Sequence, residues 1–486
     1  MLKISGLVTA ILTATAAEQT PVALSEGVTV MREEAIFERR NGDTYAAEEI
    51  TMMVPARWGV DDDAQMQVSM IRLPAVNPRG LPPVIYLAGG PGGSGTGTAR
   101  VRRWPLFDGM RQVTDVILLD QRGTGISGRP RRCVSSVGFG PSDVIDEDLL
   151  STRTNEAFRE CLTFWDAEGI DLRAYTTAES AGDIAAVADL FGGKVSLVGI
   201  SYGSHLALAT LKAHADKIDR AVLVGVEGLN QTVKLPARVD DYLERLQAAV
   251  DQDPAAKERY PDIVALLNRV ITNMDDQPAT VVIAEVDGEP KTRVFTGDMA
   301  RVAISSSVSD PWAVRRLLDA FWRADEEGDY QGFARLGGRV PDQISLDAMS
   351  TGMDLASGIT PRRLRRVEAQ AEKATVGITH NFPMPSLLEA GAAYQLSDSF
   401  RFKPRGDTPI LVFSGTLDGR TFPEAGREAT SGLRKNRGIV TVENAGHNLF
   451  LDHPDIIPSI VRFLEGEEIP SQDLTADLPS FLPREE

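Results

Sequence analysis

The chain has 486 residues, of which 42% are hydrophobic, and its 69 acidic and 51 basic residues give a formal net charge of −18. This length and hydrophobic content can bury the core of one large domain with an insertion, or the cores of two domains. The negative charge argues against nucleic acid and anionic lipid as partners, and the two cysteines are too few for a structural zinc site.

Residues 1–17 have the features of an export signal. Lys3 gives a positive start, residues 4–13 are mostly apolar, and residues 14–17 offer an A-x-A cleavage site. We therefore expect a signal peptide over 1–17 and an exported protein, periplasmic or secreted; the alternative is an N-terminal helix of a cytosolic protein. No later segment has the roughly 18 to 20 uninterrupted apolar residues of a spanning helix, so we expect no membrane span.

Short hydrophobic runs alternate with helical segments along much of the chain. After three β-rich stretches at 27–40, 49–58 and 64–74, the runs lie at 83–88, 115–120, 195–199, 220–225, 409–415 and 438–444. The segment 177–193 has apolar residues at helical spacing and ends in two glycines. Continuous apolar runs separated by helices predict an α/β fold, with a mainly parallel sheet covered on both faces by helices.

The strand alternation stops between about Asn230 and Pro385. Charged amphipathic helices replace it, as at 238–253 and 311–328, and a β-like piece at 279–295 contains Asp287-Gly288, which is typical of a hairpin turn. We predict that 231–385 is an inserted, mostly helical cap, and that 18–230 and 386–486 form the core. The last residues, 466–486, are acidic and rich in proline, and we expect them to form an extended tail.

The chain has two cysteines, Cys133 and Cys161. In an exported protein such a pair is expected to form one disulfide. Two buried free thiols are the alternative, because the sequence does not reveal the pairing geometry.

The sequence Gly199-Ile200-Ser201-Tyr202-Gly203 fits the G-x-S-x-G pattern of a nucleophile elbow. In that turn a strand passes sharply into a helix and exposes the serine hydroxyl at the edge of the sheet. The apolar run before it is of strand type, and residues 204–215 after it have helical spacing. The pattern is short, so Ser201 could equally be an ordinary serine in a glycine-rich turn. The presence or absence of catalytic partners elsewhere in the sequence distinguishes the two interpretations.

Two residues that follow strands are suited to be those partners. A serine hydroxyl needs an imidazole to take its proton and a carboxylate to orient the ring. Of the five histidines, His447 follows the last predicted strand, and Asp418 follows the strand before it. The chain order Ser201, Asp418, His447 is that of the α/β-hydrolase fold. One oxyanion donor is expected from the glycine-rich segment 87–95 and the other from the backbone N–H of Tyr202.

Three motifs together resemble those of the prolyl aminopeptidase and tripeptidyl aminopeptidase family of α/β-hydrolases. They are GGPGGSG at 89–95, DQRGTGIS at 120–127 and GISYGS at 199–204. The resemblance covers roughly 84–225 and 409–450, and the predicted cap carries little of it. It implies an α/β-hydrolase fold with an inserted cap and a serine peptidase activity.

The resemblance also implies roles for single residues. Ser201 is the expected nucleophile, His447 the base and Asp418 its orienting acid, and the N–H groups of Gly90 and Tyr202 are the expected oxyanion donors.

Further roles and two departures concern residues around this set. Asp120 and Arg122 are expected to support the site through an ion pair that holds the glycine loop. Glu227 is the candidate for holding a substrate ammonium group, and a solvated loop glutamate is its alternative. Where many family members have histidine before the glycines this chain has Ala88, and where they have DxxTP after the acid it has DGRTF at 418–422.

We therefore expect an exported serine hydrolase, an aminopeptidase that releases N-terminal amino acids or short peptides through an acyl-enzyme. The expected partner is a small peptide or ester substrate, and no metal or organic cofactor is expected. A carboxylesterase or small-amide hydrolase with the same triad is the alternative, because the fold does not fix the substrate. A non-catalytic binding protein is disfavoured because every part of the triad and glycine loop is present. The oligomeric state is left open.

Overall fold

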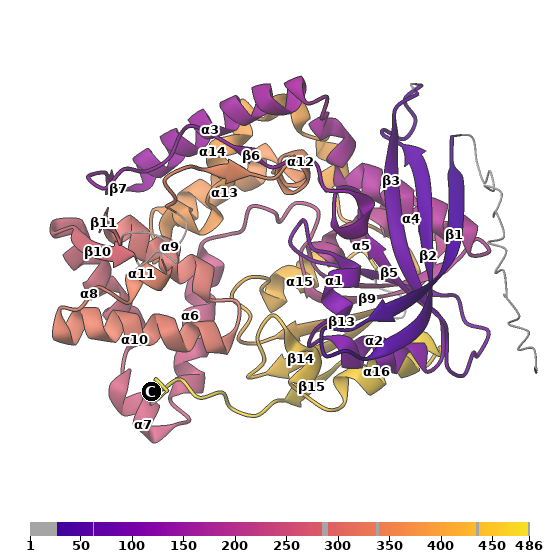
Figure 1. Cartoon of the computed structure of the whole chain (residues 1–486). Coiled ribbons are helices and arrows are strands. Elements are labelled where there is room, and N and C mark those ends of the chain that lie inside the picture. Colours follow the sequence, from indigo (N-terminus) through magenta and orange to yellow (C-terminus); the bar gives the residue numbers. More distant parts are fainter. Residues whose placement is uncertain (1–26, 62, 284–289, 337–339, 434–436, 485–486) are drawn as a thin grey trace, which may run out of the picture.

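The computed structural model describes residues 27–61, 63–283, 290–336, 340–433 and 437–484. The expected signal peptide at 1–17 and the expected hairpin turn at Asp287-Gly288 lie outside the described residues. Figure 1 shows one half of the molecule built around a large twisted sheet and another half made mostly of helices.

A ten-stranded sheet forms the centre of the first half. Its strands, in the order in which they lie side by side, are β1 (Thr29–Glu38), β2 (Thr44–Pro55), β3 (Gln65–Leu73), β5 (Val116–Asp120), β4 (Val84–Leu87), β8 (Val195–Ser201), β9 (Ile218–Val226), β13 (Ile410–Gly415), β14 (Arg437–Glu443) and β15 (Gln472–Thr475). The strands from β5 to β15 are parallel, and β1, β2 and β3 extend them antiparallel. The predicted α/β class with a mainly parallel sheet is confirmed.

Helices cover both faces of this sheet, as continuous apolar strands require. On one face, α2 (Trp104–Arg111) and α16 (Ile456–Leu464) pack in one hydrophobic cluster with the strands. On the other face, α4 (Thr177–Leu190) and α5 (Tyr202–Ala213) pack in a second cluster, which also includes Ala429 of α15 (Pro423–Ala429). The strands β4 and β5 are buried along their whole length, which explains why their sequences are uninterrupted apolar runs.

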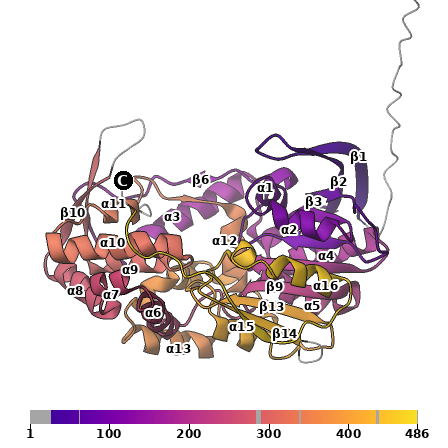
Figure 2. The ribbon, with the colours of Figure 1, turned by 90° about the horizontal axis from the view of Figure 1, so that it is seen from below.

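The second half of the molecule is mainly helical (Figure 1, Figure 2). Its elements are α6 (Ala237–Val250), α7 (Pro254–Arg259), α8 (Ile263–Asp276), β10 (Ala279–Ile283), β11 (Lys291–Phe295), α9 (Gly297–Ser307), α10 (Pro311–Glu327), α11 (Phe333–Leu336), β12 (Ser345–Leu346), α12 (Ala348–Ser357), α13 (Pro361–Ala371) and α14 (Met384–Ala390). Short 3-10 helices link other segments, at Gly125–Ser127, Leu172–Tyr175, Ala215–Lys217, Gly377–Asn381, Ala392–Tyr394, Asp398–Arg401 and Leu449–Leu451. Within the described ranges, every helix is too short or too polar to span a lipid bilayer.

A second stretch of chain also packs in the helical half, which the sequence pattern did not predict. It comprises β6 (Cys133–Val134), β7 (Val144–Ile145) and α3 (Glu147–Ala167). The strand β6 pairs with β12, and β7 pairs with β11. Figure 1 shows α3 running beside α14, and its residues Leu150 and Ala157 belong to the core cluster of the helical half. The helical half is therefore not formed by one continuous insertion.

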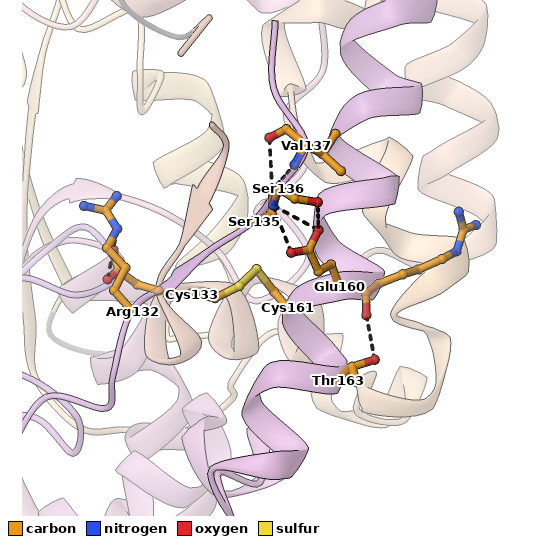
Figure 3. Close-up of a disulfide and its surroundings, with 10 residues drawn as sticks. Arg132, Cys133, Ser135, Ser136, Val137, Glu160, Cys161 and Thr163 are labelled. Atoms are coloured by element: carbon orange, nitrogen blue, oxygen red, sulfur yellow. Dashed lines mark hydrogen bonds and ion pairs between the residues drawn. A yellow bond between two sulfur atoms is a disulfide. The ribbon is translucent and has the colours of Figure 1, made fainter. Parts of the chain in front are cut away.

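The expected disulfide between Cys133 and Cys161 is present and lies within this second stretch. It joins β6 to α3 (Figure 3), with 5.6 Å between the two Cα atoms. Next to it, the carboxylate of Glu160 accepts hydrogen bonds from the backbone N–H and the hydroxyl of Ser136. The disulfide thus fixes the segment that leaves the sheet half to α3.

The C-terminal residues do not form the free extended tail that their composition suggested. The strand β15 adds to the edge of the large sheet by pairing with β14. The chain then runs to the helical half (Figure 1, Figure 2), where Phe481 is fully buried in the core cluster of that half. Hydrophobic side chains spaced between the prolines provide this anchoring, and their signal is too sparse to read as a strand or helix.

Candidate active site

Ser201 lies at a sharp turn between β8 and α5. It is one of two non-glycine residues with positive φ among those described, with φ of 56°. A Cβ atom on Gly199 would collide with the carbonyl oxygen of Gly203, and one on Gly203 would collide with the carbonyl oxygen of Leu87. Only glycine fits at both positions, so the G-x-S-x-G sequence produces the tight strand-to-helix turn that presents the serine at the edge of the sheet.

The glycine-rich segment lies next to this serine. It follows β4, which is the parallel neighbour of β8, and a Cβ atom on Gly89 would be 3.0 Å from the Cβ atom of Ser201. Gly90 has φ of 127°, a backbone conformation that a residue with a side chain avoids. The structure therefore places the segment that contains Gly90 next to Ser201, and Tyr202 follows Ser201 in the chain. Their role as oxyanion donors stays a prediction.

Asp418 and His447 form a hydrogen-bonded pair. His447 Nδ1 donates to Asp418 Oδ2 at 2.8 Å, and the backbone N–H groups of Arg420 and Thr421 each donate to Asp418 Oδ1 at 2.8 Å. Thr421 Oγ1 also donates to Asp418 Oδ2 at 2.6 Å and lies 3.0 Å from His447 Nδ1. Asp418 is fully buried, yet its hydrogen-bond acceptors are all used.

These donors keep Asp418 ionised. Burial alone would raise the pKa of Asp418, but the charge and hydrogen bond of His447 and the hydrogen bonds of Thr421 outweigh burial and lower the pKa. An ionised carboxylate that holds Nδ1–H leaves His447 Nε2 as the nitrogen that can accept a proton.

The pair and the serine lie on neighbouring strand ends. The imidazole of His447 packs on Gly225 of β9, where an added Cβ atom would be 3.1 Å from both Cε1 and Nδ1. The next residue, Val226, is the register partner of Ser201. Within the described part of the chain, no hydrogen bond joins Ser201 Oγ to His447; such bonds often form only when substrate is bound.

A turn from the helical half supports both loops of the pair. The backbone N–H of His447 donates to Ser309 O at 2.8 Å, and that of Gly419 donates to Val308 O at 2.8 Å. The buried carboxylate of Asp310 accepts from the backbone N–H of Asn448 at 3.0 Å and from its side-chain amide at 2.8 Å. Sequence reasoning missed this turn, because nothing in its sequence indicates where the loop between α9 and α10 docks.

Asp120 supports the glycine loop, but not through the expected ion pair with Arg122. Its carboxylate accepts from Ser94 Oγ at 2.8 Å, from the N–H and hydroxyl of Thr96 at 3.0 and 2.6 Å, and from the Ile126 N–H at 2.9 Å. These bonds tie the end of the glycine loop to β5.

Arg122 faces away from Asp120, so the predicted ion pair between them is wrong. Its buried guanidinium makes a double hydrogen bond with Asp183 of α4, at 2.7 and 2.5 Å. It also donates to Ala56 O at 2.6 Å and Ala174 O at 2.7 Å. Asp120 is the last residue of β5 and Arg122 lies in the turn that follows, so the acid can bond the glycine loop while the arginine bonds α4.

Glu227 is buried at the end of β9 and is not a solvated loop residue. Its carboxylate pairs with Lys234 Nζ at 3.0 Å and lies 3.9 Å from His205 Nδ1. Burial raises its pKa, but the charges of Lys234 and then His205 outweigh burial and lower it. The sequence suggested that the Glu227 carboxylate would bind a substrate ammonium group, but in the structure this carboxylate is already paired with Lys234.

Asp354 of α12 is a second acid that sequence reasoning missed. It is half-buried, and within the described ranges its carboxylate has no hydrogen-bond or ion-pair partner. Burial, with a further contribution from the negative charge of Glu227, raises the pKa of Asp354 to about 7. A single aspartate in an amphipathic helix gives no sequence signal that would have found it.

Among the described residues, no group of three or more His, Cys, Asp or Glu side chains could hold a metal ion.

The parallel sheet, the elbow after β8 and the acid–histidine pair after β13 and β14 define an α/β-hydrolase fold. Residues 82–268 match the family model described as alpha/beta hydrolase fold. The protein therefore has the fold of the α/β-hydrolases, which are generally hydrolytic enzymes. No curated protein matches the chain.

Solved structures of other α/β-hydrolases are similar to this chain at low identity. An alpha/beta hydrolase enzyme from a Medee basin deep-sea metagenome library is 12% identical, with 85% of this chain and 98% of that chain covered and a TM-score of 0.38. An epoxide hydrolase from an endophytic Streptomyces is 13% identical, with 93% and 99% covered and a TM-score of 0.37. An esterase from Exiguobacterium antarcticum is 13% identical, with 83% and 97% covered and a TM-score of 0.36. Membership of the aminopeptidase family stays a prediction.

Proposed function

We propose that this protein is a serine hydrolase that cleaves ester or amide bonds through an acyl-enzyme on Ser201. The observation that carries the proposal is the Asp418–His447 hydrogen bond of 2.8 Å, on loops at the same sheet edge as the Ser201 elbow. Nucleophile, base and orienting acid are then supplied by three strand ends of one sheet.

The proposed reaction has two steps. The Ser201 hydroxyl attacks the substrate carbonyl while His447 Nε2 takes its proton, and the tetrahedral oxyanion is stabilised by the N–H groups of Gly90 and Tyr202. His447 gives the proton to the leaving alcohol or amine, which leaves the acyl group on Ser201. Water then attacks the acyl-enzyme with His447 as base, the acid product departs, and the serine is restored. Asp418 stays ionised throughout and stabilises the imidazolium.

We further propose that the substrates are peptides, cleaved from their free amino end. The three shared motifs support this assignment. The candidate acids for attracting an ammonium group are Glu227, although it is paired with Lys234, and Asp354. Export of the protein is proposed on residues 1–17 and is supported by the disulfide, since disulfides persist in oxidising compartments. We retain 18–230 with 386–486 as the proposed core and 231–385 as the proposed cap, except that the stretch from β6 to α3 packs with the cap.

A carboxylesterase or small-amide hydrolase is the second candidate. The ion pair between Glu227 and Lys234 favours it, because a carboxylate already bonded to a lysine attracts a substrate ammonium group less strongly. An esterase needs no such acid.

A substrate panel separates these candidates. Amino-acid, dipeptide and tripeptide arylamides are assayed beside their N-acetylated forms and simple aryl esters, with Ser201→Ala as the control. Cleavage of free-amine arylamides that acetylation abolishes supports the aminopeptidase. Turnover of esters alone, blocked or not, supports the esterase. Activity that persists in Ser201→Ala contradicts both, since each requires this nucleophile.

A further inference from the structure

Arg420 is a cationic side chain on the same loop as the orienting acid. It follows Asp418 by two residues, and its backbone N–H donates to Asp418 Oδ1 at 2.8 Å. Its side chain is exposed, and within the described part of the chain its guanidinium has no ion-pair partner. It is also part of DGRTF, the segment in which this sequence departs from the aminopeptidase pattern.

Arg420 lines a narrow pocket beside the proposed triad, together with Glu227, Lys234 and Thr421. The interior of this pocket is only about 10 Å³, so a substrate carboxylate would bind at its opening, against the exposed Arg420 side chain. One wall belongs to the base, because Thr421 contacts His447 Nδ1 and Asp418. Glu227, on another wall, is linked to the nucleophile helix, because its backbone N–H donates to Ser204 Oγ at 2.9 Å and that hydroxyl donates to the carbonyl oxygen of Ser201 at 2.6 Å. A group bound here is held close to the reacting centre.

The pocket is positively charged although the chain as a whole is strongly acidic. Its charged side chains are four cations and two acids: Lys234, Arg238, Arg363, Arg420, Glu227 and Glu428.

Three of the four cations have an acidic partner. Lys234 pairs with Glu227 at 3.0 Å, and Arg238 pairs with an aspartate one turn away on α6 at 2.7 Å. The closest approach of Arg363 to Glu428 is 3.7 Å. Arg420 is the remaining cation, and its planar guanidinium can form two parallel hydrogen bonds with a carboxylate.

Lys234 lies near enough to Arg420 to feel its charge. Burial lowers the pKa of Lys234, the negative charge of Glu227 opposes burial, and the positive charge of Arg420 lowers this pKa further, while the nearby Asp354 raises it. An anion placed beside both cations would relieve that repulsion. The pocket lining has two more cations than acids, and Glu227 is already paired with Lys234. This excess of positive charge favours a negatively charged group on the substrate.

We propose that Arg420, with Lys234 behind it, binds a carboxylate of the substrate and makes the enzyme select esters or amides that carry an anionic group near the scissile carbonyl. This inference rests on the proposed hydrolase function at Ser201. It goes beyond that function by assigning a charge to the substrate and a residue that recognises it.

Two pairs of esters that differ only in charge test the proposal. In the first pair the acyl group ends in a carboxylate or an amide, as monoaryl glutarate and aryl glutaramate. In the second pair the leaving group carries the difference, as butyrate esters of 4-hydroxybenzoate and 4-hydroxybenzamide. The measured quantity is the ratio of kcat/KM for the anion to kcat/KM for the amide, which cancels any loss common to both substrates.

For the wild type we expect a ratio of about 10 or more in at least one pair, as one charge-assisted hydrogen bond provides. Arg420→Gln should bring that ratio close to 1, and Arg420→Lys should give an intermediate value because the charge stays but the fork is lost. The matched control is Arg79→Gln, an exposed arginine whose nearest acid is 3.9 Å away, and it should keep the wild-type ratio. Equal hydrolysis of both members in both pairs, or a ratio that Arg420→Gln leaves intact, overturns the proposal.

Binding measured without turnover separates this inference from the proposed hydrolase. Calorimetric titration of glutarate and glutaramide into Ser201→Ala, with and without Arg420→Gln, should show glutarate bound more tightly only when Arg420 is present. If the protein hydrolyses none of the esters but still binds glutarate through Arg420, the proposed hydrolase function is refuted and the anion site is supported. Hydrolysis without any difference in binding or in the kinetic ratios refutes the anion site alone.

Discussion

Replacing Thr421 with valine tests the acid–histidine pair most locally. Valine has nearly the shape of threonine, so the substitution removes the hydroxyl that donates to Asp418 Oδ2 at 2.6 Å without opening a cavity. The bond is made to a buried charged group, and such bonds contribute about 1.5 to 3 kcal/mol. If this energy is lost from the transition state, kcat/KM falls by roughly 10- to 100-fold.

The same change should alter stability in acid. The fold lowers the pKa of Asp418, so this group contributes stability that is present above its unfolded pKa, near 3.9, and lost as pH falls through the folded value. Without the Thr421 hydroxyl the folded pKa rises, and acid unfolding should begin at a higher pH.

The assays are kcat/KM on an ester that the wild type cleaves and the acid unfolding midpoint followed by circular dichroism. Thr421→Ser is the matched variant, because it keeps the hydroxyl and should retain most of the activity and acid stability. A Thr421→Val protein with unchanged kcat/KM and an unchanged acid midpoint would refute the reasoning, as would a loss of the same size in Thr421→Ser.

Three further predictions concern other parts of the molecule. Replacing both Cys133 and Cys161 with serine should lower the free energy of unfolding by about 3.5 kcal/mol, from the 28-residue separation that the disulfide closes, and denaturation with a reductant should then destabilise the wild type but not the variant. Asp354→Asn should gain stability relative to the wild type as pH rises from about 4 to 8. The pKa of Asp354 is raised to about 7 in the folded protein, so the folded wild type keeps a proton that the unfolded chain has released, and its stability falls across this range. A difference in melting temperature that is independent of pH would contradict this. Asp310→Asn should reduce kcat/KM about 10-fold by loosening the loop that follows the proposed base. The control is Asp319→Asn, which removes a 3.0 Å bond between α10 and Arg259 outside the site and should leave kcat/KM unchanged.

Periodicity and strong turn motifs made most of the sheet half predictable. The elbow could be located because only glycine fits at Gly199 and Gly203. This requirement produces the G-x-S-x-G motif, which is recognisable in the sequence. The strands that precede Asp418 and His447 are apolar runs that the sequence shows clearly. Their positions predicted that both residues follow strand ends at the same edge of the sheet.

Contacts between distant segments could not be predicted in the same way. The stretch from β6 to α3 reads as part of the core, and its pairing with β11 and β12 involves only two residues per strand, too few for a pattern. The partner of Arg122 depends on which way one side chain turns after a strand, and so does the pairing of Glu227 with Lys234. Such choices are made by packing in three dimensions and not by local propensity.

The central claim is that Ser201 is a nucleophile activated by His447. The most direct measurement is covalent labelling with a fluorophosphonate, read by intact-protein mass spectrometry and peptide mapping. The account predicts one label per chain, located on Ser201, absent from Ser201→Ala and formed much more slowly in His447→Gln. Labelling that persists in Ser201→Ala, or a Ser201 that stays unmodified in the wild type, would contradict it.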